Sequence, residues 1–407
     1  MRFGIVLLCV LMLFVGCEEN TKNTNLSEGM WLVELDVMDN QVLPFNLKVV
    51  KNDERGYSMQ IFNAEEVIDL DEVEIRGDSI IMQTPVFEGY LAGTFTKTIM
   101  HGQFIKESLD RIVPFTATYG TVNRFETKND SASRNVSGIW ETYFSPDLTE
   151  EYVGKGIFLQ EDNKVTGTFR TTTGDYRFLE GVLDGDSLKL SAFDGAHAFL
   201  FNAKITDSTM HGIFYSGNHF KEPFIATRND GFELPDPDSL TFLNDGYDKL
   251  AFTFPDIQGN MISLSDEKYQ DKVVIVQLMG TWCPNCLDET KFLVDYLKSN
   301  DDIEVIGLAF ESAKTKEKAI KGIKRLIDRA GVTYPILLAQ FGTYDKQLAQ
   351  EKLPMLNHVL SYPTTIFIDK KGNVRKVHTG FNGPATGKKY TEFKTSFSTL
   401  IAKLSNE

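Results

Sequence analysis

Short runs of alternating apolar and polar residues fill the chain between about residues 29 and 230. Examples lie at residues 44–50, 79–82, 158–160 and 187–190. Turn-forming groups rich in Asn, Asp and Gly separate the runs, as at residues 52–53, 76–78, 162–163 and 184–186. Alternation of period two, bounded by such turns, predicts antiparallel β-strands with one buried face. An all-β region is therefore expected here.

The β-rich region repeats itself at a spacing of about 109 residues. Four short motifs recur in the same order: Gly-x-Trp at 29–31 and 138–140, Gly-Asp-Ser at 77–79 and 185–187, Met-His-Gly at 100–102 and 210–212, and Pro-Phe-x-Ala-Thr at 114–118 and 223–227. These matches predict two tandem modules, at about 27–124 and 134–230, each an antiparallel meander forming a small barrel or half of a sandwich. One sheet system shared by both modules is the alternative. Trp31 and Trp140 are expected to fill the module cores.

The pattern changes after about residue 240. An acidic, proline-containing linker at 231–245 is expected to form a stiff exposed spacer. Beyond it, strands are predicted at 273–276, 304–308, 334–338, 364–368 and 374–377, and helices at 289–298 and 317–330. Strands that alternate with helices indicate an α/β domain over residues 246–407. We therefore expect a multidomain chain, with an antiparallel all-β N-terminal region and a C-terminal α/β domain.

The N-terminus has the pattern of an export signal. A short positive start precedes residues 3–16, which carry no charge and suit the apolar core of a signal peptide. The run ends at Cys17 and resembles a bacterial lipobox, although Phe14 stands where leucine is usual. We expect a lipoprotein signal at 1–16, a lipidated Cys17 and a polar tether at 17–28. An uncleaved hydrophobic anchor and a plain secretory signal are the alternatives.

Composition and cysteine usage restrict the function classes. The 407-residue chain has a net charge of −15, which argues against nucleic-acid binding because phosphate recognition needs basic patches. Cys9 lies within the signal and Cys17 is the lipidation candidate, which leaves Cys283 and Cys286 for chemistry. A single Cys-x-x-Cys pair does not form a framework of structural disulfides, and two thiolates alone do not complete a tetrahedral zinc site; a distant histidine would have to contribute. A redox pair without a metal or another cofactor is expected.

The residues around the cysteine pair suit thiol–disulfide exchange. A predicted strand runs into Trp282, and a helix is predicted to begin at about Cys283. Unpaired backbone N–H groups and the positive end of the helix dipole would stabilise a Cys283 thiolate and make it the nucleophile. Cys286 lies one turn further along and can attack the mixed disulfide. Pro284 fits an early helical position because its missing N–H is not needed there.

Two motifs carry a resemblance to a known family. Residues 254–286, which end in Gly-Thr-Trp-Cys-Pro-Asn-Cys, and residues 361–369, which begin Ser-Tyr-Pro-Thr-Thr, resemble the TlpA/ResA-like thiol–disulfide oxidoreductases of bacterial membranes, within the redoxin superfamily. The resemblance covers about residues 250–403 and implies a thioredoxin fold. It also implies that Pro363 is cis, and that the backbone beside it holds an extended substrate segment through strand-like hydrogen bonds.

The same resemblance assigns roles to single side chains. The substrate-binding surface is expected to comprise Trp282, Pro284, Tyr362, Pro363 and Thr364. Glu289 matches an acidic residue near the cysteines, and is expected to join Cys283 and Cys286 as a catalytic residue by relaying protons to and from Cys286. An exposed helix carboxylate is the alternative. Gln277 stands at the position of the buried acid of thioredoxin and cannot titrate, which increases the weight on Glu289.

The sequence as a whole predicts a lipid-anchored protein-disulfide reductase of the cell envelope, facing the periplasm or on the outer membrane. Its expected partners are exported proteins that contain disulfides, the membrane itself and an external thiol donor. The acidic residues 18–19 resemble surface-export signals of some Bacteroidetes lipoproteins. The alternative is that the β modules carry the main role by binding an envelope partner or glycan. A thiol peroxidase is disfavoured, because the residues before Cys283 lack the Pro-x-x-x-Thr pattern of peroxiredoxins.

Overall fold

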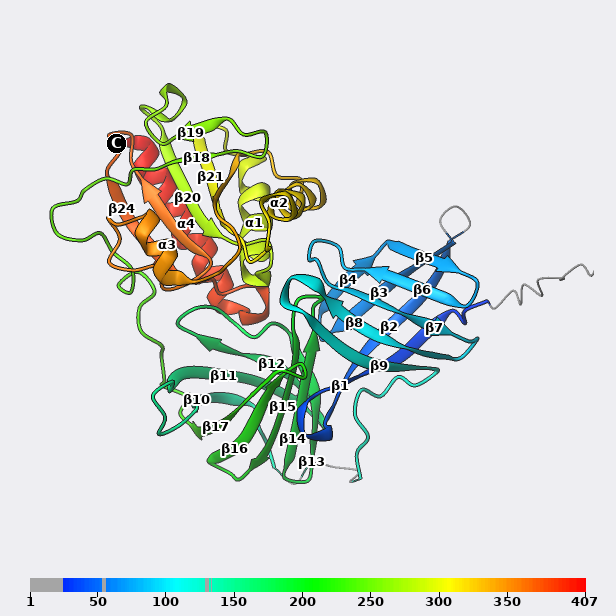
Figure 1. Cartoon of the computed structure of the whole chain (residues 1–407). Coiled ribbons are helices and arrows are strands. Elements are labelled where there is room, and N and C mark those ends of the chain that lie inside the picture. Colours follow the sequence, from blue (N-terminus) through cyan, green and yellow to red (C-terminus); the bar gives the residue numbers. More distant parts are fainter. Residues whose placement is uncertain (1–24, 53–55, 129–131, 133) are drawn as a thin grey trace, which may run out of the picture.

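Three parts follow one another along the chain: an open β-sheet, a β-barrel and an α/β domain (Figure 1). The computed structural model describes residues 25–52, 56–128, 132 and 134–407. The predicted signal at 1–16, Cys17 and most of the tether lie outside the described residues. Among the residues that are described, no helix combines the length and the apolar character needed to cross a bilayer.

The first part is an antiparallel sheet of nine strands in the spatial order β4-β3-β2-β1-β9-β8-β7-β6-β5. Its strands are β1 (Gly29–Asp36), β2 (Val42–Asn52), β3 (Gly56–Asn63), β4 (Glu66–Leu70), β5 (Glu72–Arg76), β6 (Ser79–Gln83), β7 (Tyr90–Phe95), β8 (Ile99–Lys106) and β9 (Arg111–Tyr119). The strands predicted at 44–50 and 79–82 lie within β2 and β6. The sheet stays open between β4 and β5.

The second part is a closed antiparallel barrel of eight strands. They are β10 (Gly138–Phe144), β11 (Tyr152–Glu161), β12 (Lys164–Thr171), β13 (Leu179–Asp184), β14 (Ser187–Phe193), β15 (Ala198–Ile205), β16 (Thr209–Ser216) and β17 (Phe220–Arg228). Aromatic side chains fill the interior; for example, the Phe169 ring lies 5.5 Å from that of Phe144 and 4.8 Å from that of Phe201. The interior of this small barrel is therefore a packed core.

Trp31 and Trp140 occupy equivalent places in the two β parts. In each part the first strand pairs with both the second and the last. Both tryptophans are fully buried, and each indole N–H donates to the carbonyl four residues earlier, at 3.0 Å to Ser27 and at 2.8 Å to Val136. Their predicted place in the module cores is confirmed. A buried indole needs such a partner for its N–H, and both modules supply it in the same way.

The two repeats differ in closure, and Phe193 at the end of β14 lies where they pack together. Its ring stacks on Phe45 at 4.4 Å and meets Phe104 edge-on at 4.9 Å, within the core of the open sheet. The Asn63 side chain donates to the Phe193 carbonyl at 2.9 Å and accepts from its N–H at 3.2 Å. Because the outside of the barrel completes this core, the first sheet buries its apolar face without closing on itself.

The third part is built on a five-stranded sheet in the order β22-β21-β20-β23-β24, in which β20, β21 and β22 are parallel. Its strands are β20 (Val273–Met279), β21 (Ile303–Phe310), β22 (Ile336–Gln340), β23 (Thr364–Ile368) and β24 (Val374–Thr379), preceded by the hairpin of β18 (Thr253–Pro255) and β19 (Met261–Ser263). The helices are α1 (Pro284–Leu297), α2 (Lys316–Ala330), α3 (Lys346–Lys352) and α4 (Lys388–Asn406). The predicted fold class, an all-β N-terminal region followed by a thioredoxin-like α/β domain, is confirmed.

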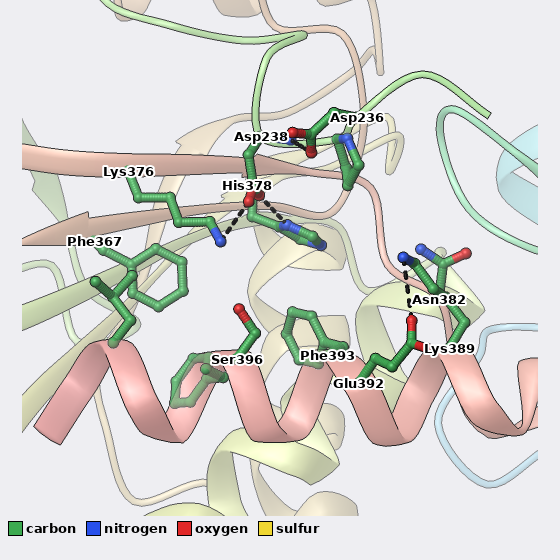
Figure 2. Close-up of a pocket in the computed structure, with 13 residues that line it drawn as sticks. Asp236, Asp238, Phe367, Lys376, His378, Asn382, Lys389, Glu392, Phe393 and Ser396 are labelled. Atoms are coloured by element: carbon green, nitrogen blue, oxygen red, sulfur yellow. Dashed lines mark hydrogen bonds and ion pairs between the residues drawn. The ribbon is translucent and has the colours of Figure 1, made fainter. Parts of the chain in front are cut away.

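The linker is largely exposed, as predicted, but it also docks on the α/β domain. The Pro237 carbonyl accepts a hydrogen bond from the Thr379 N–H at 3.0 Å, as an added strand would. The Asp238 carboxylate lies 2.6 Å from His378 Nδ1 and 2.5 Å from Lys376 Nζ (Figure 2). A small cavity of about 140 Å³ lies between this segment, β24 and α4. The linker is therefore exposed but held along the edge strand of the α/β domain.

Candidate active site

The cysteine pair lies where β20 ends and α1 begins. Cys283 is the N-cap of α1, with Pro284 at the first helical position as predicted. The Cys283 sulfur accepts a hydrogen bond from the Cys286 N–H at 3.2 Å, and the thiol lies 3.4 Å from the Tyr362 carbonyl. An N-terminal backbone N–H that points at sulfur stabilises a thiolate. Cys283 is therefore placed as the attacking thiol.

Cys286 is buried in the first turn of α1. Its side chain is fully covered, whereas Cys283 keeps 7% of its surface exposed, and both are free thiols. Burial, with the hydrogen bond and charge of Cys283 adding to it, raises the pKa of the Cys286 thiol well above its usual value. Cys286 is thus a poor nucleophile until a base removes its proton. Among the described residues, no three His, Cys, Asp or Glu side chains are grouped so as to hold a metal ion.

Glu289 lies one turn beyond Cys286 and is 1% exposed, so the exposed-carboxylate alternative is wrong. One carboxylate oxygen accepts from Gln277 Nε2 at 2.9 Å, and the other accepts from the Thr365 hydroxyl at 2.5 Å. Gln277 also donates to the Cys286 carbonyl at 3.3 Å. Burial raises the pKa of Glu289 to about 7, although the hydrogen bonds from Thr365 and Gln277 oppose the shift. The group therefore exchanges its proton near neutral pH.

Trp282 forms an aromatic surface beside the cysteines. Its ring lies 5.5 Å from Tyr344 and 5.8 Å from Tyr362, and its indole N–H donates to the Phe310 carbonyl at 2.9 Å. Of the two tyrosines beside Trp282, Tyr344 is 50% exposed. Beyond Trp282, a cavity of about 470 Å³ lies between α2 and the loop that joins β6 to β7.

Glu311 is a second buried carboxyl group near the motif. Its two oxygens accept hydrogen bonds from the Thr281 N–H at 2.8 Å and the Thr281 hydroxyl at 2.6 Å. Burial raises its pKa to about 7 against these hydrogen bonds, with Glu88 adding to the shift. Glu311 therefore fixes the turn that leads into Trp282, and matches Glu289 in burial and in the direction of its pKa.

The second motif faces the first. The peptide bond between Tyr362 and Pro363 is cis, as the resemblance implies, and the Tyr362 carbonyl contacts the Cys283 thiol. Thr364 is fully buried, and its hydroxyl donates to the Ser361 carbonyl at 2.8 Å. The Thr364 side chain therefore supports the proline turn and, in correction of the expectation, does not face a substrate.

The structure brings together Cys283, Cys286, Glu289, Trp282, Tyr362 and Pro363, all named from the sequence. It adds Thr365, Tyr344 and Glu311, which sequence reasoning missed. Thr365 lies 76 residues from Glu289, and Glu311 lies 30 residues from Thr281. No local pattern connects such pairs, because adjacent strands bring them together only after folding.

Comparison with known proteins finds similarities to redoxins and thiol–disulfide oxidoreductases. The Redoxin family matches residues 248–392. The thioredoxin-like protein YneN of Bacillus subtilis is 29% identical over 139 residues, which cover 34% of this chain and 73% of YneN. The thiol–disulfide oxidoreductase ResA of Geobacillus kaustophilus is 26% identical over 131 residues, which cover 32% of this chain and 66% of ResA, just under two thirds of its length.

A solved thiol–disulfide oxidoreductase from Bacteroides fragilis covers 36% of this chain and 99% of its own, with 18% identity and a TM-score of 0.27. The matched family region contains the cysteine pair, and the sheet and barrel lie outside it. The C-terminal part of this chain is a redoxin domain, homologous to YneN and to the ResA thiol–disulfide oxidoreductases.

Proposed function

We propose that this protein is a thiol–disulfide oxidoreductase that reduces disulfides in exported proteins. The observation that carries the proposal is the position of Cys283, whose sulfur caps α1 and accepts the Cys286 N–H at 3.2 Å. The turn at Pro363 faces the cysteine pair, since the Tyr362 carbonyl contacts the Cys283 thiol, and an extended substrate segment would pair beside this turn. The electrons reside in the dithiol itself, so no further cofactor is needed.

The reaction proceeds by two thiol–disulfide exchanges. The Cys283 thiolate attacks one sulfur of the substrate disulfide, forming a mixed disulfide and releasing the other sulfur as a thiolate, which takes up a proton. Cys286 then attacks Cys283, which releases the second substrate thiol and leaves a Cys283–Cys286 disulfide. Two electrons have passed to the substrate. An external thiol donor restores the dithiol by the same exchanges in reverse.

In this scheme Glu289 accepts the proton of Cys286 before the second exchange. Glu289 lies one turn beyond Cys286 on α1, and Gln277 donates both to the Glu289 carboxylate and to the Cys286 backbone carbonyl. A base is required because burial keeps Cys286 protonated near neutral pH. Trp282, with Tyr362 packed against it, forms the surface that meets the substrate. Pro284 is buried in the first turn of α1 and, in correction of the expectation, is not part of that surface.

Glu289→Gln should slow release of the substrate from the mixed disulfide by about 10²-fold at pH 8, because the amide cannot take the proton. In the unmodified protein the release rate should rise as pH increases through about 7, where Glu289 ionises. The variant should lose this rise. Single-turnover kinetics over pH 5–9 measure both effects, and an unchanged rise near pH 7 in the variant would exclude Glu289 as the base.

Glu311→Gln is the matched control, since Glu311 is equally buried with its pKa also raised to about 7. In Glu311→Gln the rate of substrate release should still rise as pH increases through about 7.

The release rate should rise with pH, whereas the free energy of unfolding that Glu289 contributes should fall with pH. The folded-state pKa of about 7 exceeds the ordinary value of 4.5, so the folded protein binds the extra proton between these values. Stability contributed by this group is therefore full below pH 4.5 and falls as pH rises towards 7. Urea unfolding of Glu289→Gln should show a smaller fall over that window than the unmodified protein. If the free energy of unfolding fell equally in both proteins, the pKa of Glu289 would not be raised in the folded protein.

The proposed function is tested with the full chain by reduction of glutathione disulfide, using dithiothreitol as the thiol donor. Catalysed reduction is expected, with Cys283 and Cys286 cycling between dithiol and disulfide in mass spectra. A reduction potential near that of thioredoxin, about −270 mV, supports a reductase, whereas a value near −120 mV identifies an oxidant. Absence of any catalysed exchange would overturn the proposal.

We further propose that Cys17 anchors the protein to a membrane of the cell envelope, facing the periplasm or on the outer membrane. The apolar run at 3–16 before Cys17 supports this placement. Metabolic labelling with palmitate should mark the unmodified chain, and Cys17→Ala should remain unlabelled. Equal labelling of both would exclude Cys17 as the lipid site.

A further inference from the structure

The loop between β12 and β13 of the barrel lies against the cysteine motif. The Asn285 side chain, between the two cysteines, donates to the Asp175 carbonyl at 3.3 Å. A Cβ atom on Gly174 would collide with the same Asn285 amide, so only glycine permits this approach. The Thr173 carbonyl accepts from the Ser361 hydroxyl at 2.8 Å. The barrel thus contacts both motifs of the redoxin domain.

The loop also reaches a third segment of the domain, the glycine-rich stretch after β24. A Cβ atom on Gly380 would lie 2.9 Å from the Thr173 carbonyl carbon. The Gly383 N–H donates to the Asp175 carboxylate at 2.7 Å. The loop thus contacts the cysteine motif at Asn285, the proline turn at Ser361 and the glycine-rich stretch at Gly383. The barrel therefore covers the redoxin domain beside Asn285. Figure 1 shows the barrel lying against this end of the domain.

Strong contacts hold the loop in place on both flanks. Arg177 forms buried ion pairs with Asp288 of α1 and, at 2.6 Å, with Glu66 of the open sheet. On the barrel side, the Tyr176 ring lies 5.2 Å from that of Phe214 and its hydroxyl lies 2.7 Å from Tyr152. Lifting the loop would separate charges that are buried in all three parts of the chain, which is strongly unfavourable. These contacts therefore hold the β12–β13 loop in one position beside the cysteine motif.

The internal repeat indicates that this position is not required by the β fold. At the repeat spacing, residues 174–178 correspond to β4, which stays in its sheet and pairs with β3. In the barrel, the equivalent stretch makes only one bridge, between Arg170 and Asp175, and otherwise leaves the sheet for the redoxin domain. The segment is therefore strand β4 in the open sheet, whereas in the barrel it is a loop that contacts the cysteine motif.

We infer that the β12–β13 loop is a specificity element that closes one side of the substrate groove. Substrate then reaches Cys283 from the side of Trp282 and Tyr344, where Tyr344 is 50% exposed. This geometry admits small disulfides and disulfides on flexible, extended segments. It rejects a disulfide set in the surface of a folded protein, whose flanking residues would collide with the loop. The inference rests on the proposed function.

The test compares the rates of reduction of glutathione disulfide and of folded insulin by the full chain. In one variant a single glycine replaces both Thr172 and Thr173, which shortens the loop by one residue. The shorter loop can still close, because the flanking residues are already near each other: the Thr171 N–H donates to the Gly174 carbonyl at 2.7 Å. The ratio of the insulin rate to the glutathione disulfide rate should rise about tenfold. A second variant, Asp175→Ala, keeps the backbone and removes the anchor to Gly383. It should raise the ratio in the same direction by less.

Glu65→Ala, in the exposed turn between β3 and β4 of the other repeat, is the matched control and should leave the ratio unchanged. Failure of the unmodified protein to reduce either disulfide would overturn the proposed function. Reduction of glutathione disulfide with an unchanged ratio in both loop variants would overturn the specificity role alone.

Discussion

Replacing Cys283 by serine is expected to slow disulfide reduction by at least about 10³-fold, down to the uncatalysed background. A serine hydroxyl remains protonated at neutral pH and does not attack sulfur, whereas the Cys283 sulfur sits at the start of α1 with the Cys286 N–H pointing at it. Serine is also a good N-cap, so the helix should persist. Any loss of rate would then report chemistry and not unfolding.

Cys286→Ser provides the matched comparison. It should also stop turnover, but Cys283 should still attack once and remain joined to the substrate as a mixed disulfide. Mass spectrometry after incubation with glutathione disulfide should find the adduct on Cys286→Ser and none on Cys283→Ser. An adduct on Cys283→Ser, or its retention of a tenth of the original rate, would assign the nucleophile to Cys286.

Replacing Arg177 by methionine is expected to destabilise the protein by about 3–5 kcal/mol. The Arg177 side chain is 7% exposed and pairs with Asp288, with Glu66 at 2.6 Å and with Asp194 at 3.5 Å. Methionine fills similar space but leaves the buried carboxylates of Asp288 and Glu66 without their cation. Urea unfolding monitored by tryptophan fluorescence measures the loss.

Two further variants separate charge from packing in this result. Adding Asp288→Asn to Arg177→Met should recover part of the stability, because one unpaired buried charge is removed. Arg76→Met, at a pair in which both side chains are largely exposed, should leave the unfolding midpoint unchanged. If Arg177→Met and Arg76→Met unfold at the same urea concentration, the buried cluster does not hold the three parts together.

Much of the architecture could be predicted from local patterns. Alternating residues located β2 and β6, and apolar runs located β20 and β23, because side-chain period and burial are local properties of a strand. The repeat predicted equivalent places for Trp31 and Trp140. Helix α4 was missed, although Phe393, Phe397, Ile401 and Leu404 form its buried face, since polar residues dilute the pattern. The docking of the linker on β24 was not predicted, because composition does not show what a chain docks against.

The sequence by itself determined the cysteine pair and its place at the start of a helix, since these depend on neighbours in the chain, and the family resemblance implied the proline turn opposite. Only the tertiary structure decided that one repeat stays open around Phe193 while the other closes. It also decided that Glu289 is buried between Gln277 and Thr365, and that the Gly174 loop covers one side of the thiol site. These outcomes depend on packing between residues far apart in the chain. The balance of burial, hydrogen bonds and charge at such contacts exists only after the parts have met.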